Sequence, residues 1–440
     1  MSGYNRNLYK KLKKFRFMLT EEQILEIIEL WRKKTRLPLK KRLIVKEIKA
    51  SINKEVIDLV GVRRSGKSSE LFLLIQELKL KDDDYLYINF EEPLFIGNYS
   101  VSLLENIWQV FKQNYNPSGK PYIFLDEIQY IEGWEQWVRK IRDLELAHVF
   151  VTGSSAKLLS KEFGTKLTGR HKTFQVFPLS FKSFLAFKGV KEQDISSKKL
   201  MVKNKQTILK HFKEFLVKGG FPEITITKNQ DLLKEYFDDI LYKDIVSRYE
   251  IRDVKSLKRL AVFCLTNITK KFSYNTIKKL YGQSLESTKA YLSFLEEAFL
   301  IFQAPFFSYS LKTQENHQRK IFAIDNGLRN AVSFRFSKDK GKLAENLVFV
   351  ELKRKNKEIF YWAGKNEVDF VVKNKDNKLI AINVTYSQEI DKKELKGLFE
   401  FKENYKQKVK ETILLTKNIE KTEKGVKFIP LWKWLLKGNL

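Results

Sequence analysis

The hydrophobic residues of the N-terminal half alternate between two spacings. Short, nearly uninterrupted apolar runs occur between about residues 51 and 180, in "EVIDLVGV", "YLYINF", "PYIFLDE", "HVFVTGS" and "KTFQVFPLS". The stretches between these runs have the apolar spacing of helices. Buried strands that alternate with helices are typical of a parallel sheet covered on both faces. We therefore expect an α/β domain here, and after it a mostly helical section over about 181–245 that "GGFP" (219–222) interrupts.

An amphipathic helix is expected near the N-terminus, in "LTEEQILEIIELW". Thr20 stands where an N-cap would, and Gln23 follows at the spacing of a capping box. The apolar positions that follow share one helical face and are Ile24, Ile27, Ile28 and Trp31. Residues 1–50 hold 15 Lys/Arg and 5 Asp/Glu, so this basic arm is either a tethering helix with solvated lysines or an arm that contacts nucleic acid.

The pattern changes again over residues 250–310. "FSYNTIKKLYGQSLESTKAYLSFLEEAFLIFQAPFFS" indicates a helix, a turn at Gly282, a second helix opened by Ser284 or Ser287, and two extended aromatic edges. This order predicts a winged helix-turn-helix. After "RKIFAIDNGL" a final α/β block runs to the C-terminus. No internal repeat or low-complexity linker separates these parts, so we expect packed domains.

Composition narrows the class of partner. The chain carries 83 Lys+Arg against 53 Asp+Glu, a formal net charge of +30. Nucleic acid or an anionic membrane would screen such an excess, and a lysine-rich chain without a specific partner is the alternative. Cys264 is the single cysteine and the chain has 4 His, which excludes an internal disulfide and disfavours a zinc site. Since no apolar run approaches the ~18 residues of a membrane helix, we expect a soluble, cytoplasmic protein.

The strongest chemical signal is "GVRRSGKSS" (61–69), which fits GxxxxGK[ST] with Gly61, Gly66, Lys67 and Ser68. In such a loop, glycines let backbone N–H groups wrap phosphates, the lysine reaches the β- and γ-phosphate oxygens, and the hydroxyl binds Mg²⁺. The loop follows an apolar strand and opens a helix, as this chemistry requires. We therefore expect a site for ATP and Mg²⁺. The other nucleotide-binding candidates of the loop are Arg64, Ser65 and Ser69.

A pair of carboxylates, Asp126 and Glu127, ends the apolar strand in "YIFLDEIQ", 59 residues after Lys67. We expect this strand beside the P-loop strand, where Asp126 can hold the Mg²⁺ water shell and Glu127 can orient and deprotonate the attacking water. The structural alternative is a strand that ends in acidic turn residues. The extra strand "YLYINF" between the two motifs, with the tandem carboxylates, favours the hydrolytic P-loop branch over kinases and GTPases.

Two further polar positions are catalytic candidates. Ser154, after the strand in "HVFVTGSSA", is the candidate that senses the γ-phosphate or the water, and Ser155 is the second choice. Arg170, in "LTGRHKTFQVFPLS", precedes the last strand of the domain. It could insert a guanidinium into a neighbouring subunit's site and stabilise the charge of the transferring phosphoryl group. A surface salt bridge is the alternative role for Arg170.

These motifs occur in an order that resembles a family. "GVRRSGKSS", "FLDEIQYIEGWEQWVRK", "VFVTGSSAKLLS", "GRHKTFQVFPLSFKSFL" and "GGFPEI" are followed by "YKDIVSRYEIRDVKSL", "KIFAIDNGLRNAV", "LAENLVFVEL" and "NEVDFVV". Together, over about residues 45–390, they resemble the AAA+-related ATPases of archaea and bacteria that carry a winged helix and a restriction-nuclease-like C-terminal domain.

The resemblance implies an AAA+ core, a helical lid in which "GGFP" and its Pro222 lie near the nucleotide, and homo-oligomers in the form of hexameric rings. For archaeal members it implies a likeness to branch-migration motors of the RuvB type. We expect a basic N-terminal arm over 1–44, the ATPase core over 45–183, the lid over 184–249, the winged helix over 250–312 and the nuclease-like domain over 313–440.

The C-terminal domain departs from the nuclease pattern. That pattern has a helix Glu, a strand Asp and (D/E)-x-K on the next strand, with carboxylates for Mg²⁺ and a lysine that polarises the water. Glu345 and Asp369 occupy the first two places, but Asn383 and Thr385 stand in the third, in "LIAINVTYS". Glu367 is a poor substitute ligand. We therefore expect a degenerate site without cleavage and a domain that binds or assembles.

The leading functional hypothesis is an ATPase that moves or remodels duplex or branched DNA. Its expected backbone contacts are Lys278, Lys279 and Lys289, which would position the protein without reading sequence. The winged helix could instead bind protein. The alternative function is a nucleotide-dependent switch of signalling or defence, which hydrolyses ATP slowly and changes partners. A metal nuclease is the third class.

Overall fold

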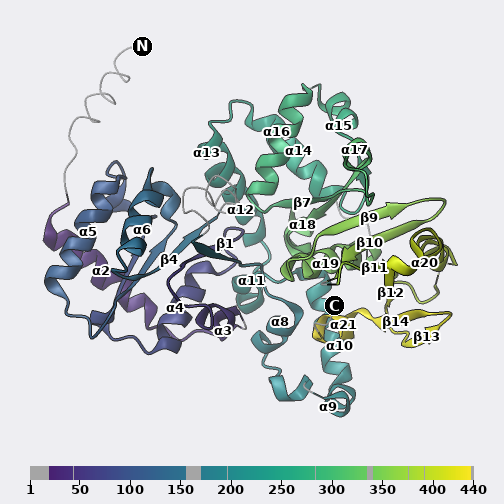
Figure 1. Cartoon of the computed structure of the whole chain (residues 1–440), viewed down its shortest axis with the longest axis horizontal. Coiled ribbons are helices and arrows are strands. Elements are labelled where there is room, and N and C mark those ends of the chain that lie inside the picture. The colour runs from purple at the N-terminus through teal and green to yellow at the C-terminus, as the bar shows by residue number, and fades with distance from the viewer. Residues whose placement is uncertain are drawn as a thin grey trace. The chain divides into compact units, whose positions relative to one another are not determined.

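The computed structural model describes residues 19–42, 44–154, 170–195, 197–282, 284–333, 340–374, 376–390 and 392–437. The chain divides into two compact units (Figure 1). Unit 1 comprises Met1–Gly61 and Gly66–Val176, and unit 2 comprises Val62–Ser65 and Phe177–Leu440. Val62–Ser65, the middle of the P-loop, is thus part of unit 2.

Unit 1 is built on a five-stranded sheet in the order β2-β3-β4-β1-β5. All of its strand pairs are parallel. The strands are β1 (Val56–Val60), β2 (Tyr85–Asn89), β3 (Tyr122–Asp126), β4 (His148–Gly153) and β5 (His171–Gln175). The first four lie within the apolar runs and β5 begins one residue before the fifth, so the sequence prediction of a parallel α/β sheet is confirmed.

One detail of the predicted sheet is wrong. The strand that ends at Asp126 does not lie beside the P-loop strand, because β4 pairs with both β1 and β3. The order of strands in a sheet depends on where each crossover returns, which apolar runs do not encode. The carboxyl ends of β1, β3 and β4 still meet at the same edge.

Helices cover both faces of this sheet (Figure 1). They are α2 (Glu21–Thr35), α3 (Ile44–Lys49), α4 (Lys67–Leu78), α5 (Val101–Asn114) and α6 (Trp134–Asp143), with short 3₁₀ turns at η1 (Asp82–Asp84), η2 (Pro93–Phe95) and η3 (Ile128–Tyr130). The core under α3 and α4 joins Ile57 and Leu59 of β1 to Leu71 and Leu74 of α4. Both faces of the sheet are therefore buried.

Helix α2 confirms the predicted amphipathic helix. Thr20 and Gln23 form the capping box, and Ile24, Ile27 and Ile28 are buried. The helix packs against β2, α4 and α5. Residues 21–35 are thus part of the globular fold of unit 1, while the basic residues 1–18 lie outside the described residues.

The first part of unit 2 is helical, as predicted. Its elements are α8 (Phe181–Phe187), η5 (Glu192–Ile195), α9 (Lys198–Lys203), α10 (Lys205–Lys218), α11 (Pro222–Thr227), α12 (Leu232–Asp239), the π-helix η6 (Ile240–Val246) and α13 (Ser247–Tyr249). The glycines of "GGFP" separate α10 from α11, and Pro222 is at the first turn of α11, where its missing N–H costs nothing.

The next segment has the predicted helix-turn-helix. Its elements are α14 (Val254–Thr266), β6 (Lys271–Phe272), α15 (Tyr274–Tyr281), α16 (Leu285–Glu297), β7 (Ile301–Ala304), α17 (Leu311–Asn316) and β8 (Arg319–Ala323). Gly282 ends α15 at φ 65°, where glycine is favoured, and Ser284 rather than Ser287 caps α16. The three strands pair antiparallel in the order β6-β8-β7.

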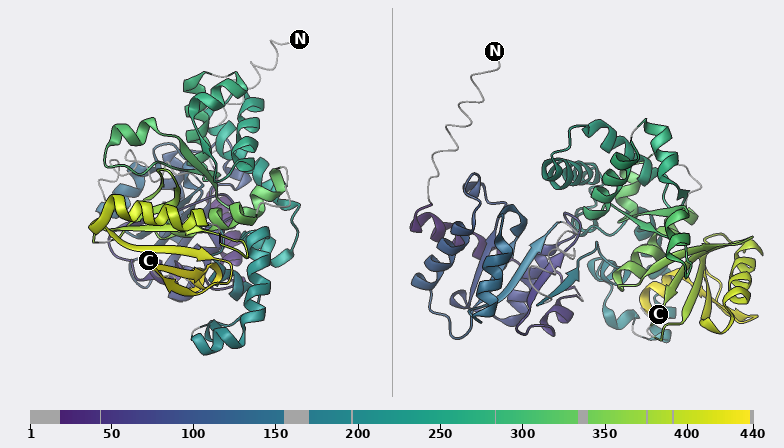
Figure 2. Two further views of the ribbon diagram at one scale, coloured as in Figure 1. Left: turned by 90° about the vertical axis from the view of Figure 1, so that its right-hand side faces the viewer. Right: turned by 45° about the horizontal axis from the view of Figure 1, so that its top comes forward.

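The C-terminal part contains a six-stranded mixed sheet in the order β13-β14-β12-β11-β10-β9. Its elements, with those that precede it, are α18 (Asn326–Val332), α19 (Lys340–Arg354), β9 (Ile359–Ala363), β10 (Glu367–Lys373), β11 (Leu379–Val384), α20 (Lys392–Tyr405), η7 (Lys406–Lys408), β12 (Val409–Thr416), β13 (Lys421–Glu423), β14 (Val426–Pro430) and α21 (Leu431–Lys437). The sheet lies between α19 and α20 (Figures 1 and 2).

In the part of the chain that the structure describes, every helix is too short or too polar to cross a membrane. Cys264 is free and fully buried in α14, where burial raises the pKa of its thiol.

Candidate nucleotide site

The P-loop begins where β1 ends. Gly61 lies so close to β5 that a Cβ atom there would be 2.1 Å from the carbonyl oxygen of Val176. Gly66 has φ 99° and is the N-cap of α4, so a side chain would strain this turn. Only glycine suits both positions, and the N-terminus of α4 is consequently left open toward an anion.

Lys67 is the first residue of α4 and is 4% exposed. Its ammonium donates to the carbonyl oxygen of Gly61 at 3.1 Å and lies 3.4 Å from Oε1 of Glu127. The P-loop lysine and the carboxylate after β3 are therefore in one cluster, although 60 positions separate them in sequence.

Asp126 ends β3 and is fully buried. Its carboxylate accepts from the hydroxyl of Tyr87 at 2.6 Å, from the side-chain amide of Asn89 at 3.2 Å and from the hydroxyl of Thr152. The Ser68 hydroxyl also bonds to it. Burial, and then the charge of Glu127, raises the pKa of Asp126, while these hydroxyl contacts lower it. The predicted Mg²⁺ pair, Ser68 and Asp126, is thus in direct contact.

Glu127 is 7% exposed and follows Asp126 at the turn after β3. Its backbone N–H donates to the Thr152 hydroxyl at 3.0 Å, and its side chain accepts from the amide of Gln129. Thr152 thereby holds both carboxyl residues in place from β4. Ser154 is buried just beyond the end of β4, at the same edge of the sheet, and Ser155 lies outside the described residues.

Sequence reasoning missed the role of the P-loop arginines. Arg63 is 7% exposed and donates through Nε and an Nη nitrogen to the carboxylate of Asp244, at 3.2 and 3.0 Å. Arg64, a nucleotide-binding candidate, lies 3.9 Å from Asp239 and over the ring of Tyr236, and its role at the nucleotide stays a prediction. A signal was present, since Asp244 is the one carboxylate in the mostly apolar stretch "ILYKDIV" (240–246).

The remaining P-loop candidates complete the loop. Ser65 is fully buried and its backbone N–H donates to the carbonyl oxygen of Val62 at 3.2 Å. Ser69 lies in the first turn of α4 and is partly buried.

These residues fit ATP with Mg²⁺. The open helix N-terminus and the Lys67 ammonium suit the β- and γ-phosphates, and the Ser68 hydroxyl with the Asp126 carboxylate supplies the oxygen ligands that Mg²⁺ prefers. The bond between Ser68 and Asp126 shows that the two side chains already face one another.

Arg170 lies at the opposite end of the strands from the P-loop, where β1 and β5 begin. It precedes β5, and its carbonyl oxygen accepts from the N–H of Val56, where β1 begins. The five residues of β1 separate this end from the P-loop by roughly 16 Å. The guanidinium is half exposed and pairs with Asp143 at 2.9 Å. Within its own subunit Arg170 thus makes a surface salt bridge, and its donation to a neighbouring subunit stays a prediction.

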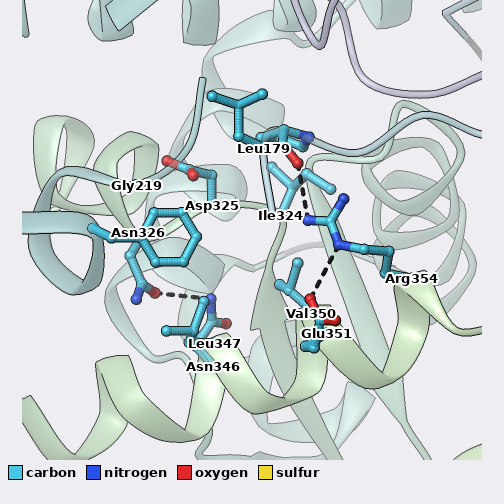
Figure 3. Close-up of a pocket in the computed structure, with 12 residues that line it drawn as sticks. Leu179, Gly219, Ile324, Asp325, Asn326, Asn346, Leu347, Val350, Glu351 and Arg354 are labelled. Carbon is cyan, nitrogen blue, oxygen red and sulfur yellow. Dashed lines mark hydrogen bonds and ion pairs between the residues drawn. The ribbon is translucent and has the colours of Figure 1, made fainter. Parts of the chain in front are cut away.

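The "GGFP" glycines contact the "IDNGL" turn. Asp325 accepts from the N–H of Gly220 at 2.7 Å and from that of Leu328 at 3.0 Å. A Cβ atom on Gly219 would be 2.0 Å from Oδ1 of Asp325. Asp325 and Gly219 line a cavity of about 20 Å³, large enough for one water (Figure 3). The "GGFP" and "IDNGL" segments are therefore in direct contact. The role of Pro222 at the nucleotide stays a prediction.

The residues predicted to form a degenerate nuclease site make two kinds of contact. Glu345 of α19 and Asp369 of β10 both contact the ammonium of Lys320. Asn383 of β11 is instead bonded to the backbone of Asp369 and of Glu394, and Thr385 bonds to Ser387. The (D/E)-x-K positions thus hold the fold, and Lys320 was not foreseen.

The DNA-binding candidates lie on the helix-turn-helix. Lys278 and Lys279 are exposed in the last turn of α15, and Lys289 is exposed on α16, 5.6 Å from the ring centre of Tyr274. Unit 2 also has a groove of about 440 Å³ along α14, which includes Lys255, Lys258, Arg259 and Tyr281.

Comparison with known proteins agrees with the fold. A family model described as an AAA domain matches residues 53–185. Two domains of unknown function, DUF8612 and DUF4143, match residues 209–339 and 340–434.

The chain is also similar in part to two solved structures. The Aeropyrum pernix ORC1 protein in complex with DNA is 13% identical over 68% of this chain and 93% of its own, with a TM-score of 0.33. AMPPCP-bound DnaA from Aquifex aeolicus is 15% identical over 59% and 89%, with a TM-score of 0.25. At such scores no role is transferred from either.

Two curated proteins resemble the chain along nearly its whole length. An uncharacterised protein of Methanocaldococcus jannaschii is 34% identical over 95% of both chains. An uncharacterised protein of Haemophilus influenzae is 31% identical over 86% of this chain and 93% of its own. The chain therefore belongs to the family of the M. jannaschii protein, and its N-terminal region is an AAA domain with the parallel-sheet core of AAA+ P-loop ATPases.

Proposed function

We propose that this protein hydrolyses ATP and uses the energy to move on, or remodel, duplex or branched DNA. The observation that supports hydrolysis is the cluster of Lys67, Ser68, Asp126 and Glu127 at one edge of the parallel sheet. A second carboxylate directly after the Mg²⁺-binding Asp is the feature that a hydrolase needs to activate water.

Each residue has a distinct part in this reaction. The N-terminus of α4 and Lys67 bind and neutralise the phosphates, and Ser68 with Asp126 holds Mg²⁺, which supplies positive charge at the γ-phosphate. Glu127 accepts a proton from the attacking water. Because Lys67 and Glu127 are 3.4 Å apart, the arrival of phosphate would compete with Glu127 for the ammonium and release the carboxylate for that task.

Charge and exposed lysines support DNA as the partner. The net charge of +30 suits phosphate tracking, and Lys278, Lys279 and Lys289 are exposed on the two helices that flank the Gly282 turn. We propose that residues 254–323 act as a winged helix on DNA backbone phosphates. The antiparallel sheet β6-β8-β7, with β6 before the two helices and β7 and β8 after them, is consistent with this.

An ATPase assay across single-stranded, duplex and four-way-junction DNA at low salt tests this function. We expect turnover to rise several-fold with duplex or junction DNA and the rise to fade with salt. The triple variant Lys278→Ala, Lys279→Ala, Lys289→Ala should lose the stimulation and keep the basal rate. Lys46, exposed on α3, offers a control for loss of charge alone. Turnover indifferent to every polynucleotide would refute the DNA role.

We further propose that the active form is a ring in which Arg170 completes a neighbour's site. Arg170→Ala should then lower turnover without loss of ATP binding. Arg139→Ala is the matched control, because Arg139 pairs with the same Asp143. Mixing Arg170→Ala with Lys67→Ala should restore part of the activity. If mixing restores none, Arg170 has only its structural role.

A nucleotide-dependent switch is the second candidate function. The pair between Arg63 and Asp244 favours it, because it ties the P-loop segment to the helical part of unit 2 and could report nucleotide occupancy there. Glu127→Gln distinguishes the two functions. In a DNA motor it should trap an ATP-bound complex on DNA, whereas in a switch it should hold one protein partner and leave DNA binding unchanged.

A further inference from the structure

Unit 2 contains a second buried lysine–carboxylate cluster, remote from the P-loop in sequence. The ammonium of Lys320 lies 2.5 Å from Glu367, 2.8 Å from Glu345 and 3.3 Å from Asp369. The Lys320 side chain is 2% exposed. Burial alone would lower the pKa of Lys320, but the three carboxylates raise it well above its ordinary value. The lysine is therefore held as a cation.

The three carboxylates around Lys320 are stable together only with a cation between them. Glu345 and Asp369 are 14% and 16% exposed and lie on different elements, α19 and β10. Like charges this close repel strongly away from water, and a buried charge without a partner costs several kcal/mol. Asp369 also accepts the N–H of Val384 at 2.9 Å, which fixes its orientation toward the cluster.

The position of Lys320 in the fold is equally informative. Lys320 lies on β8, next to Lys271 of β6 in the antiparallel register. Opposed lysines on neighbouring strands repel each other. Glu367 offsets this repulsion, because one of its carboxylate oxygens lies 2.5 Å from the Lys320 ammonium and the other 2.5 Å from that of Lys271. The cluster therefore links the three-stranded sheet of the helix-turn-helix to the C-terminal sheet.

We propose that the Lys320 ammonium is the permanent cation of this carboxylate cluster, where it takes the place of a divalent metal and fixes the helix-turn-helix sheet to the C-terminal sheet. The site is a latent metal site for a hard cation such as Mg²⁺ or Mn²⁺, closed as long as Lys320 is present. This goes beyond the ATPase function, and it does not depend on it.

The geometry explains why the cluster does not select metal as it stands. Distances of 2.5 to 3.3 Å suit an ammonium, whereas Mg²⁺ requires oxygens at about 2.0–2.1 Å. Among the described residues, no group of three or more His, Cys, Asp or Glu is placed to hold a metal. Asn383, on the neighbouring strand, contributes hydrogen bonds to the backbone instead of a fourth carboxylate.

Lys320→Met in the full chain tests the proposal, because methionine keeps most of the length of the side chain without its charge. Thermal unfolding is followed without nucleotide, in EDTA or in Mn²⁺. We expect the variant to lose about 10 °C in EDTA and to regain at least half of that in Mn²⁺. Lys271→Met, the matched control at the half-exposed side of Glu367, should lose far less and gain nothing from Mn²⁺.

Mn²⁺ binding, measured by electron paramagnetic resonance without nucleotide, gives a second readout. The wild type should show no site tighter than about 1 mM, and Lys320→Met should gain one of about 100 µM or tighter. Adding Asp369→Asn to Lys320→Met should remove it. A wild-type site that Asp369→Asn abolishes, or a Lys320→Met protein as stable in EDTA as the wild type, would overturn the proposal.

A variant that does not fold remains informative. In the triple variant Lys320→Met, Glu345→Gln, Asp369→Asn, two of the three carboxylates are neutral, so folding should return in EDTA without metal. If the triple variant is as unstable as Lys320→Met, the lysine does not act by neutralising the cluster, and the proposal is wrong.

Discussion

Two regions of this protein place a buried lysine against carboxylates, and they differ in how many carboxylates surround it. At the P-loop, Lys67 lies 3.4 Å from the carboxylate of Glu127 and donates to the carbonyl oxygen of Gly61. In the C-terminal cluster, Lys320 lies within 3.3 Å of three carboxylates. The first lysine thus faces one carboxylate within 3.4 Å, and the second faces three.

This difference shows how the number of carboxylates around a buried lysine distinguishes a site that can exchange ligands from one that stabilises the fold. Asp126 is supported by hydroxyl and amide donors rather than by a lysine, so it is available to a metal ion. Asp369 is already matched by a cation on its own chain. A phosphate that reaches Lys67 would compete with the Glu127 carboxylate for its ammonium, whereas a metal would have to displace the Lys320 ammonium from three carboxylates. Only the first site is prepared to exchange ligands.

The largest expected effect is on turnover at the P-loop site. Lys67→Ala should lower ATP hydrolysis by at least about 100-fold, because it removes the cation closest to the phosphates. Its thermal stability should fall less than that of Lys320→Met, since Lys67 lies 3.4 Å from one carboxylate whereas Lys320 contacts three. Steady-state hydrolysis and a melting curve check both statements, with Lys46→Ala as the control. A large loss of stability would show that Lys67, like Lys320, is structural.

An intermediate effect is expected where a P-loop arginine is tightly paired. Asp244→Asn leaves the buried Arg63 guanidinium without its anion, so the free energy of unfolding should fall by about 3 kcal/mol. Asp239→Asn is the matched control, because its contact with Arg64 is 3.9 Å and partly exposed, and it should cost less than about 1 kcal/mol. Denaturant unfolding measures both. Equal losses would mean that the Arg63 pair is no stronger than the exposed one.

The smallest expected effect is a pH dependence in unit 1. His171 lies 2.9 Å from the buried Asp58, whose hydrogen bond raises the pKa of the imidazole despite partial burial. A raised pKa of a base stabilises the fold below the pKa of the unfolded chain, about 6.5, and this is lost as pH rises through the higher folded value. His171→Asn should therefore cost about 1 kcal/mol or less at pH 6 and less still at pH 9.

His148 provides the opposite case for the same measurement. Burial lowers the pKa of His148, so its protonation opposes folding as the pH falls. His148→Asn should then gain stability relative to the wild type as the pH falls. The pH dependence of its stability difference should therefore have the opposite sign to that of His171→Asn. Parallel slopes for the two variants would show that the Asp58 contact does not determine the behaviour of His171.

Much of the fold was predictable because apolar spacing is a local property. The five strands, the capping box at Thr20 and the helix-turn-helix around Gly282 each follow from residues within a few positions of one another. The placement of β4 between β1 and β3 was not predictable in this way. The strand order depends on where each crossover connection packs, and this involves segments far apart in the chain.

The sequence by itself determined the chemistry of the nucleotide site. Gly66, Lys67 and the Asp126–Glu127 pair have few alternative uses at that spacing after apolar strands, because a phosphate cradle needs those residue types. Only the tertiary structure decided what the remaining charges do. It paired Arg63 with Asp244, 181 positions away, and put Lys320 among carboxylates up to 49 positions away. The energy of a buried charge depends on which opposite charges surround it, and folding alone brings those together.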